Sequence, residues 1–357
     1  MVDNVIIMAG GAGKRLWPAS LGDRPKQFMT VDGGASLIRG ALDRAFGLGI
    51  SGRVYIVTHE DHVSSALAEF RELPEAQRSR LIILAEPIAR NTAPALALAA
   101  ARMALDGRDG ETSLVMAADH LISPLEAFAA SVEAADAEAR AGAIVPYGIV
   151  PRSAATGYGY IETGAAAGRG FEVLSFREKP DAATAESYVA SGRHYWNAGL
   201  FTYRGDVFRT ELRSHQPDVD AVFADSREDW FLTREVDGIT VHEPSDELRR
   251  RYADCPAISV DYAVMEKTRN IRMVPADFEW NDVGSWDVIA ELDAPGGAPV
   301  YAVESTGNFV YSDRPVALCG VEDLIVVVAN DRVMVCRRGM SQLVKSAAEA
   351  DAQAPSS

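Results

Sequence analysis

The chain has 357 residues, of which 48% are hydrophobic and 24% are charged, and its formal net charge is −16. These proportions are typical of a globular protein with one large or two moderate domains. The acidic balance argues against broad binding to nucleic acid or to anionic membranes, because such binding requires a basic surface. No apolar run approaches the length of a bilayer span, and the first residues lack the layout of a signal peptide.

The cysteines favour a reducing compartment. Cys255, Cys319 and Cys336 are odd in number and far apart, and no CxxC pair occurs. A disulfide framework is therefore not expected. Taken with the charge balance, this pattern predicts a cytoplasmic protein without nucleic-acid or membrane partners.

The first part of the chain alternates short β-branched runs with amphipathic helical stretches. Strands are predicted at Val5–Met8, Val54–Thr58, Leu81–Leu84, Leu114–Ala117 and Ile144–Gly148. Helices are predicted at Leu37–Phe46, Asp61–Phe70, Thr92–Leu105 and Leu125–Ala139. Continuous apolar strands separated by helices indicate an α/β fold with a buried, mostly parallel sheet. Ligands of such sheets bind beyond the carboxyl ends of the strands.

After about Tyr147 the pattern changes to that of an added, partly antiparallel lobe. Strands are predicted at Tyr158–Glu162, Phe171–Glu178 and Trp196–Tyr203, with a helix at Ala182–Ser191. A helical stretch is then expected from Val207 to about Tyr252. It is followed by a strand–helix pair at Ile258–Lys267 and a strand at Ile271–Val274.

The segment Leu292–Pro299 is rich in Pro, Gly and Ala, which marks a boundary between residues 1–296 and residues 297–357. Short strands are predicted beyond it at Asn308–Tyr311, Leu324–Val328 and Val333–Cys336. Helical periodicity is weak there, so a small β module of stacked turns is expected. The last residues, Ala348–Ser357, are expected to be frayed.

A glycine cluster directly follows the first predicted strand, in the segment Ala9–Gly13. Four basic residues come next: Lys14, Arg15, Arg24 and Lys26. In an acidic chain this concentration of positive charge indicates a site for a highly charged anion. Glycines let backbone N–H groups approach phosphate oxygens, and a guanidinium can hold a phosphate through two hydrogen bonds. A glycine turn with solvated basic side chains is the structural alternative.

Two common phosphate-binding motifs do not match this segment. A P-loop requires Ser or Thr after Gly-Lys, but Arg15 follows Gly13-Lys14, and Met8 occupies the position of the first glycine. A dinucleotide fingerprint requires a final glycine where this chain has Leu16. Kinase-type and dehydrogenase-type functions therefore lose their main support.

Seven segments, in order along the chain, carry a family resemblance. They are Met8–Pro18 with Arg24–Phe28, Glu86–Ala95, Ala117–His120, Thr156–Glu162, Glu178–Pro180, Trp196–Gly199 and Trp280–Trp286. Together they resemble the sugar-1-phosphate nucleotidyltransferases. The motifs Leu-Trp-Pro and Pro-Lys-Gln-Phe are similar to those of the mannose-1-phosphate guanylyltransferase branch. The resemblance implies a Rossmann-like nucleotide-diphospho-sugar transferase fold. It also implies that the C-terminal module is a short left-handed β-helix, which in this branch commonly supports a homodimer.

The reaction that the resemblance implies joins GTP and mannose 1-phosphate to give GDP-mannose and pyrophosphate. The sugar phosphate attacks the α-phosphorus in line, so no protein nucleophile is required, and catalysis consists of positioning and charge stabilisation. Arg15 and Lys26 are the candidates for the triphosphate, because they can stabilise the charge that develops on the leaving pyrophosphate. Lys26 as a solvated turn residue remains the alternative.

Further site residues follow from the resemblance and from the chemistry of the side chains. For the nucleotide they are Ala9, Gly10, Gly11, Gly13, Asn91, Thr92 and Asp119; for the sugar phosphate they are Gly159, Glu178, Lys179 and Asn197. The alternatives are a helix cap at Asn91 or Thr92, a β-bulge at Gly159, a turn at Asn197 and an exposed ion pair at Glu178-Lys179.

Asp119 and Asp282 are the candidates for Mg²⁺, which prefers one or two carboxylates together with phosphate oxygens. Asp119 ends a predicted strand, and Asp282 lies in an apolar context that is costly for an unpaired carboxylate. Both could instead cap helices, near Pro124 and Ser285. Residues 297–357 are too few for the cupin-type isomerase domain of some relatives, so transferase activity alone is expected. Another base or sugar, or a non-catalytic regulatory subunit, remains an alternative.

Overall fold

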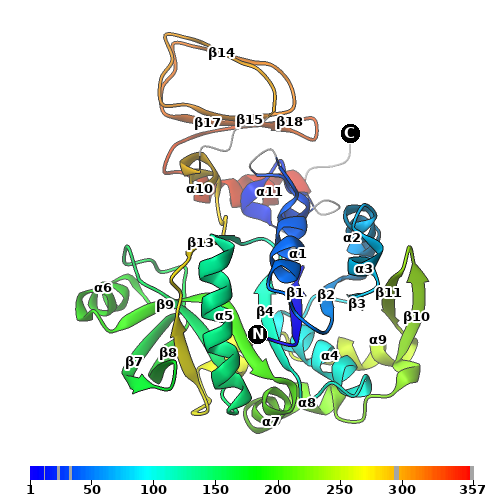
Figure 1. Cartoon of the computed structure of the whole chain (residues 1–357). Helices are drawn as coiled ribbons and strands as arrows, with labels where there is room; N and C mark the ends of the chain where they lie inside the picture. The colour runs from blue at the N-terminus through cyan, green and yellow to red at the C-terminus, as the bar shows by residue number, and fades with distance from the viewer. Residues whose placement is uncertain (12, 22–24, 32–33, 293–296, 354–357) are drawn as a thin grey trace.

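The computed structural model of the protein describes residues 1–357 except 12, 22–24, 32–33, 293–296 and 354–357. Arg24, one of the four basic residues of the glycine segment, lies outside the described residues. A large mixed sheet forms the body of the molecule, and a small β module lies at one end of it (Figure 1). The predicted α/β class with a C-terminal β module is confirmed. No helix of the described residues is long and apolar enough to cross a bilayer.

Eleven strands form the large sheet. In sheet order they are β10 (Phe231–Val236), β11 (Ile239–Pro244), β3 (Leu81–Glu86), β2 (Val54–His59), β1 (Asn4–Met8), β4 (Thr112–Ala117), β9 (His194–Arg204), β6 (Val145–Ile149), β12 (Arg272–Pro275), β8 (Gly170–Arg177) and β7 (Tyr160–Ala167). The run from β11 to β4 is parallel, whereas β9 pairs antiparallel with β4, β6 and β7. The predicted antiparallel lobe thus continues the same sheet.

The central strand β1 shows why this sheet is buried on both faces. Val5 and Ile7 enter one apolar core, and Ile6 between them enters the other. Successive side chains of a strand point to opposite faces, so a continuous apolar run supplies two cores at once. Helices cover both faces: α1 (Leu37–Gly47), α2 (Val63–Phe70) and α5 (Leu125–Arg140) on one, and α4 (Thr92–Leu105), α7 (Gly205–His215), α8 (Pro217–Phe223) and α9 (Asp246–Ala253) on the other. Two further helices of the body are α3 (Glu75–Arg78) and α6 (Ala182–Ser191).

The predicted helical stretch from Val207 to Tyr252 is wrong in its middle. The helices α7, α8 and α9 flank a hairpin formed by β10 and β11, which pair from Phe231–Pro244 to Val236–Ile239. Asp237 and Gly238 form the turn with φ of 52° and 82°. An Asp-Gly pair with both φ values positive is a favoured two-residue hairpin turn, so this pair was an available signal.

The predicted strand at Ile258 is also wrong. Residues 256–259 have no regular structure, and the chain then makes a π-helix at Asp261–Met265. The buried side chains Ala263, Val264 and Met265 pack into the second core. Short apolar runs of this kind do not distinguish strand from helix by periodicity, and the tertiary packing decides between them.

The C-terminal module pairs short strands in parallel. Its strands are β14 (Val300–Val303), β15 (Phe309–Ser312), β16 (Val316–Cys319), β17 (Leu324–Ala329) and β18 (Arg332–Arg337). The pairs β14–β16 and β15–β17 are parallel, as in successive coils of a β-helix, and β18 returns antiparallel to β17. The strands β14 and β16, of four residues each, were not among the predicted ones.

The expectation that Ala348–Ser357 is frayed is wrong for the residues that the structure describes there. Helix α11 (Val344–Gln353) continues through them and lies against the 3₁₀ turn η1 (Lys14–Leu16), between the body and the β module (Figure 1). Val344 joins an apolar cluster with Leu16 and Val283, two residues of the body. Burial against this cluster stabilises the helix, although its position at the end of the chain favoured fraying.

Candidate active site

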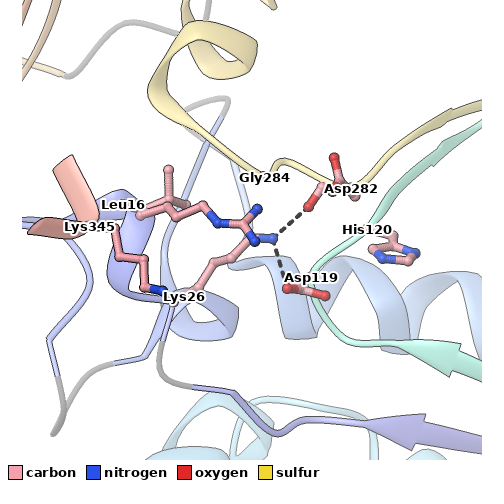
Figure 2. Close-up of a pocket in the computed structure, with 9 residues that line it drawn as sticks. Leu16, Lys26, Asp119, His120, Asp282, Gly284 and Lys345 are labelled. Carbon is pink, nitrogen blue, oxygen red and sulfur yellow. Dashed lines mark hydrogen bonds and ion pairs between the residues drawn. The ribbon is translucent and has the colours of Figure 1, made fainter. Parts of the chain in front are cut away.

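The carboxyl ends of β1 and β4 form one side of a pocket of about 340 Å³. The two strands are parallel neighbours, so the glycine segment after Met8 and Asp119 after Ala117 meet at one edge of the sheet. The pocket is lined by Gly13, Arg15, Leu16, Lys26, Asp119, His120, Asp282, Gly284 and Lys345 (Figure 2). The structure therefore brings together both candidates for the triphosphate and both candidates for the metal.

Lys26 lines this pocket and is only 8% exposed. Its Nζ donates to Oδ2 of Asp119 at 2.7 Å and to the backbone oxygen of Asp282 at 2.6 Å (Figure 2). The alternative of a solvated turn residue is therefore wrong. Charge-assisted hydrogen bonds of this length fix the ammonium at the point where β1, β4 and the segment before helix α10 (Trp286–Glu291) meet.

The packing around Lys26 requires a glycine at position 13. Its φ is +55°, and a Cβ built on it would lie 2.7 Å from Cβ of Lys26. Neither the backbone conformation nor the space accommodates a side chain. The neighbouring Gln27 is buried, and its amide donates to the backbone oxygen of Ala9 at 2.9 Å. These contacts pack the basic segment against the end of β1.

The two acidic candidates have different surroundings. Burial alone would raise the pKa of Asp119, but the adjacent charge of Lys26 holds that pKa below its usual value. Asp282 accepts a hydrogen bond from the hydroxyl of Tyr158 at 3.2 Å. Neither residue caps a helix, because Pro124 and Ser285 hold the N-cap positions of α5 and α10. Both carboxylates thus remain directed to the pocket that they line.

A second pocket of about 220 Å³ adjoins the first. Its lining includes all four candidates for the sugar phosphate: Gly159, Glu178, Lys179 and Asn197. His120 and Asp282 line both pockets, so the two cavities meet at these residues. Tyr158 and Trp280 also line the second pocket, with ring centroids 5.3 Å apart. The first pocket thus holds the cationic side chains Arg15, Lys26 and Lys345, and the smaller second pocket holds groups that donate and accept hydrogen bonds.

Gly159 leaves the space that this second pocket needs. A Cβ there would lie 2.6 Å from Oε2 of Glu178 and 3.3 Å from Cβ of Asn197. Asn197 lies within β9 and not in a turn, and its amide donates to Oδ1 of Asp261 at 3.0 Å. Its own oxygen accepts from the backbone N–H of Gly199 at 3.1 Å.

Glu178 and Lys179 form an ion pair of 2.6 Å at the rim of the pocket. The carboxylate is largely buried, with 8% of its side chain exposed, whereas 57% of the lysine side chain is exposed. Burial disfavours the charged ammonium, but the hydrogen bond to Glu178 raises the pKa of Lys179 above its usual value. The alternative of a fully exposed pair is wrong for Glu178.

Asp261 is a pocket residue that sequence reasoning missed. Burial and the nearby charge of Glu178 raise the pKa of Asp261 to about 6. Its position in the π-helix Asp261–Met265 depends on tertiary packing that no local sequence pattern indicates. Its proximity to Glu178 and Asn197 makes it part of the polar lining of this cavity.

The residues predicted to bind the nucleotide differ in how far their groups are engaged within the fold. The N–H of Ala9 donates to Val57, and its carbonyl accepts from Gln27 and Thr58 at 2.9 Å each, so its backbone groups are engaged within the fold. Gly10 and Gly11 are exposed. Gly11 has φ of +110°.

The other two nucleotide-side candidates hold the start of α4. Asn91 is the N-cap of α4, as expected, and Thr92 accepts from the backbone N–H of Val260 at 2.9 Å. Their place in nucleotide binding stays a prediction.

Two residues other than glycine at or next to the linings of the two pockets have positive φ values. They are 45° at Lys179 and 46° at Val283, next to Asp282. A β-branched residue in this conformation is strained, and such strain persists only where surrounding contacts impose it. Val283 is fully buried, which supplies those contacts. The strained backbone therefore positions Asp282 at the junction of the two pockets.

The fold, with two adjoining pockets at the carboxyl edge of its sheet, is that of a nucleotidyltransferase. A family model described as nucleotidyl transferase matches residues 4–294, and a model described as MannoseP isomerase/GMP-like beta-helix domain matches residues 299–349. The chain belongs to the nucleotidyl transferase family.

Relatives of known name share nearly the whole chain. A mannose-1-phosphate guanylyltransferase of Klebsiella pneumoniae is 38% identical, over 96% of this chain and 73% of its own length. Mannose-1-phosphate guanylyltransferase 2 of Escherichia coli O157:H7 is 34% identical, over 96% and 72% respectively. A Thermus thermophilus structure described as mannose-1-phosphate geranyltransferase has a TM-score of 0.82, with 29% identity over 98% of this chain and 99% of that one. The family resemblance predicted from the seven segments is confirmed.

Proposed function

We propose that this enzyme transfers GMP from GTP to α-D-mannose 1-phosphate, giving GDP-mannose and pyrophosphate. The observation that carries the proposal is the junction of the two pockets at His120 and Asp282. The pocket with Arg15 and Lys26 suits a triphosphate, and the smaller one suits a sugar phosphate. Two like-charged substrates meet there, so fixed cations at the meeting point lower the cost of bringing them together.

The residues have separate parts in this proposal. Lys26 and Arg15 bind the triphosphate and stabilise the charge on the leaving group, while Gly10, Gly11 and Gly13 allow the backbone to approach the nucleotide. Lys179 binds the sugar phosphate at the rim of the smaller pocket. Glu178 and Asn197 bind sugar hydroxyls, because one accepts and the other both donates and accepts hydrogen bonds.

Magnesium fits this site by the chemistry of the available donors. Asp119 and Asp282 line one pocket, and two carboxylates with phosphate oxygens and water suit Mg²⁺. Among the described residues, no group of three or more His, Cys, Asp or Glu could hold a metal without such added ligands. When bound, Mg²⁺ would neutralise phosphate charge and polarise the α-phosphate.

The decisive test is pyrophosphate release from GTP and mannose 1-phosphate by the purified chain, with and without Mg²⁺. Release that depends on both substrates and on Mg²⁺ supports the proposal. A preference for UTP or dTTP, or for another sugar 1-phosphate, would assign a different member of the family. Absence of release with every nucleotide and sugar phosphate would favour the regulatory-subunit alternative, which the intact set Arg15, Lys26, Asp119, Lys179 and Asp282 argues against.

We also propose a cytoplasmic homodimer in which residues 1–296 form the catalytic domain and residues 297–357 form the module of subunit contact. An apolar groove of about 490 Å³ on this module supports the dimer. Val335, Met340 and Leu343 line this groove, and these three side chains are exposed, as is that of Val333. Apolar patches of this kind are typical of interfaces. A monomeric mass in light scattering would contradict this part of the proposal.

A further inference from the structure

Lys345 lines the pocket of about 340 Å³ that contains Arg15 and Lys26, here called the anion pocket, although it belongs to the C-terminal module. It lies with Arg15 and Lys26 around the same cavity, and Figure 2 shows its side chain extending from α11 towards that cavity. Its Nζ is 3.9 Å from Oε1 of Glu349, which is too long for a hydrogen bond, and 59% of the side chain is exposed. The ammonium therefore remains available to a ligand.

The placement of this charge is unfavourable to the helix itself. Lys345 is the second residue of α11, whose first turn contains no acidic residue. A cation at a helix N-terminus faces the positive end of the helix dipole. Departures from such local preferences, here the preference for acidic residues in the first turn of a helix, are expected mainly at functional sites. An anion in the adjoining pocket would be attracted both by the lysine and by the N-terminus of the helix.

Helix α11 is held firmly enough to position such a group. In the 3₁₀ turn η6 (Ser341–Leu343), which directly precedes α11, Ser341 donates to the carboxylate of Asp287 in α10 from its backbone N–H at 3.1 Å and from its hydroxyl at 2.5 Å. At the other end Asp351 accepts from Arg332 at 2.9 Å and from the indole of Trp17 at 3.4 Å. Between these contacts Val344 is buried in the cluster that joins module and body. Contacts on both sides thus pre-organise the lysine.

The order of groups across the pocket indicates which part of a ligand Lys345 meets. His120 and Asp282 also line the sugar-side pocket, and Figure 2 shows Lys345 on the side of the cavity opposite His120. An extended triphosphate with its α-phosphate near the sugar pocket would place its terminal phosphates near Lys345.

We propose that Lys345 binds the β- and γ-phosphates of the nucleoside triphosphate, so that the C-terminal module completes the active site in the same chain. This inference rests on the proposed function. In the reaction an oxygen of the sugar phosphate bonds to the α-phosphorus, and the bond from that phosphorus to the oxygen bridging to the β-phosphorus breaks. The electron pair leaves with pyrophosphate, and Lys345 stabilises that charge beside Arg15 and Lys26.

The test compares Lys345→Ala and Lys345→Arg with Glu349→Gln, which changes the neighbouring carboxylate and leaves the lysine. Two readouts are needed: the KM values for GTP and mannose 1-phosphate, and the affinity for inorganic pyrophosphate by calorimetry with Mg²⁺. We expect Lys345→Ala to raise the GTP KM and weaken pyrophosphate binding by about tenfold, the loss expected for one charge-assisted hydrogen bond. The KM for mannose 1-phosphate should change little, Lys345→Arg should retain most of the affinity, and Glu349→Gln should behave as wild type.

The outcomes separate this inference from the proposed function. Wild-type values for both GTP KM and pyrophosphate affinity in folded Lys345→Ala would overturn the role of Lys345. If the wild-type chain releases no pyrophosphate from GTP and mannose 1-phosphate, the proposed function fails. Calorimetry with pyrophosphate would still decide whether Lys345 binds it. Thermal melting of each variant shows that the comparison is made on folded protein.

Discussion

Replacing Lys26 by Ala tests the centre of the site most directly. The change removes two hydrogen bonds, of 2.7 Å to Asp119 and 2.6 Å to the backbone of Asp282, and it removes a cation from the anion pocket. A hydrogen bond to a charged group contributes about 1.5–3 kcal/mol. Loss of one such interaction with the transition state corresponds to a fall in turnover of roughly 10- to 150-fold.

The effect on folding should be of the same order as the loss of transition-state stabilisation, and small enough for the variant to fold. The side chain of Asp119 is 29% exposed, so water can replace part of what it loses when Lys26 is removed. We expect destabilisation of about 1–3 kcal/mol, the cost of leaving a partly buried acceptor without its partner. The variant should therefore fold and melt somewhat earlier.

The assay is the initial rate of pyrophosphate release at saturating GTP and mannose 1-phosphate, with melting curves on the same preparations. Lys267→Ala is the matched control, since it removes the same side chain from an exposed position outside both pockets. Turnover of folded Lys26→Ala within twofold of wild type would refute the role of this ammonium. A variant that does not fold would be replaced by Lys26→Met, which keeps the buried aliphatic stem.

Three further predictions concern the walls of the two pockets. Gly159→Ala places a Cβ 2.6 Å from Oε2 of Glu178, so the KM for the sugar phosphate should rise about tenfold or more with little change in the KM for GTP. Gly13→Ala combines φ of +55° with a 2.7 Å approach to Lys26, so both turnover and melting temperature should fall. Asp261→Asn should flatten the pH dependence of stability. Because the folded-state pKa of Asp261 is raised from 3.8 to about 6, wild type loses stability as pH rises through this range and the variant does not. An equal change in melting temperature between pH 4 and pH 7 in wild type and in the variant would contradict this prediction.

Local patterns were sufficient for the central layers of the fold. The apolar run of β1 alternates between two cores, and helix Thr92–Leu105 has the predicted bounds, because its cap Asn91 and its apolar faces are encoded within a few residues. The meeting of Asp119 with the glycine segment also followed from sequence, since parallel strands end at one edge. The β10–β11 hairpin was missed although its Asp237-Gly238 turn is a local signal.

The sequence by itself determined the chemistry available to this protein: the basic segment, the acidic residues after apolar strands and the family to which the chain belongs. Only the tertiary structure decided that Asp261 lines the same pocket as Glu178 and Asn197, and that Lys345 lines the same pocket as Arg15 and Lys26. Both residues belong to short elements whose conformation depends on burial against distant segments, as Val344 packs against Leu16 and Val283. Local propensity is too weak to specify such contacts, because their free energy comes from surface that distant parts of the chain bury together.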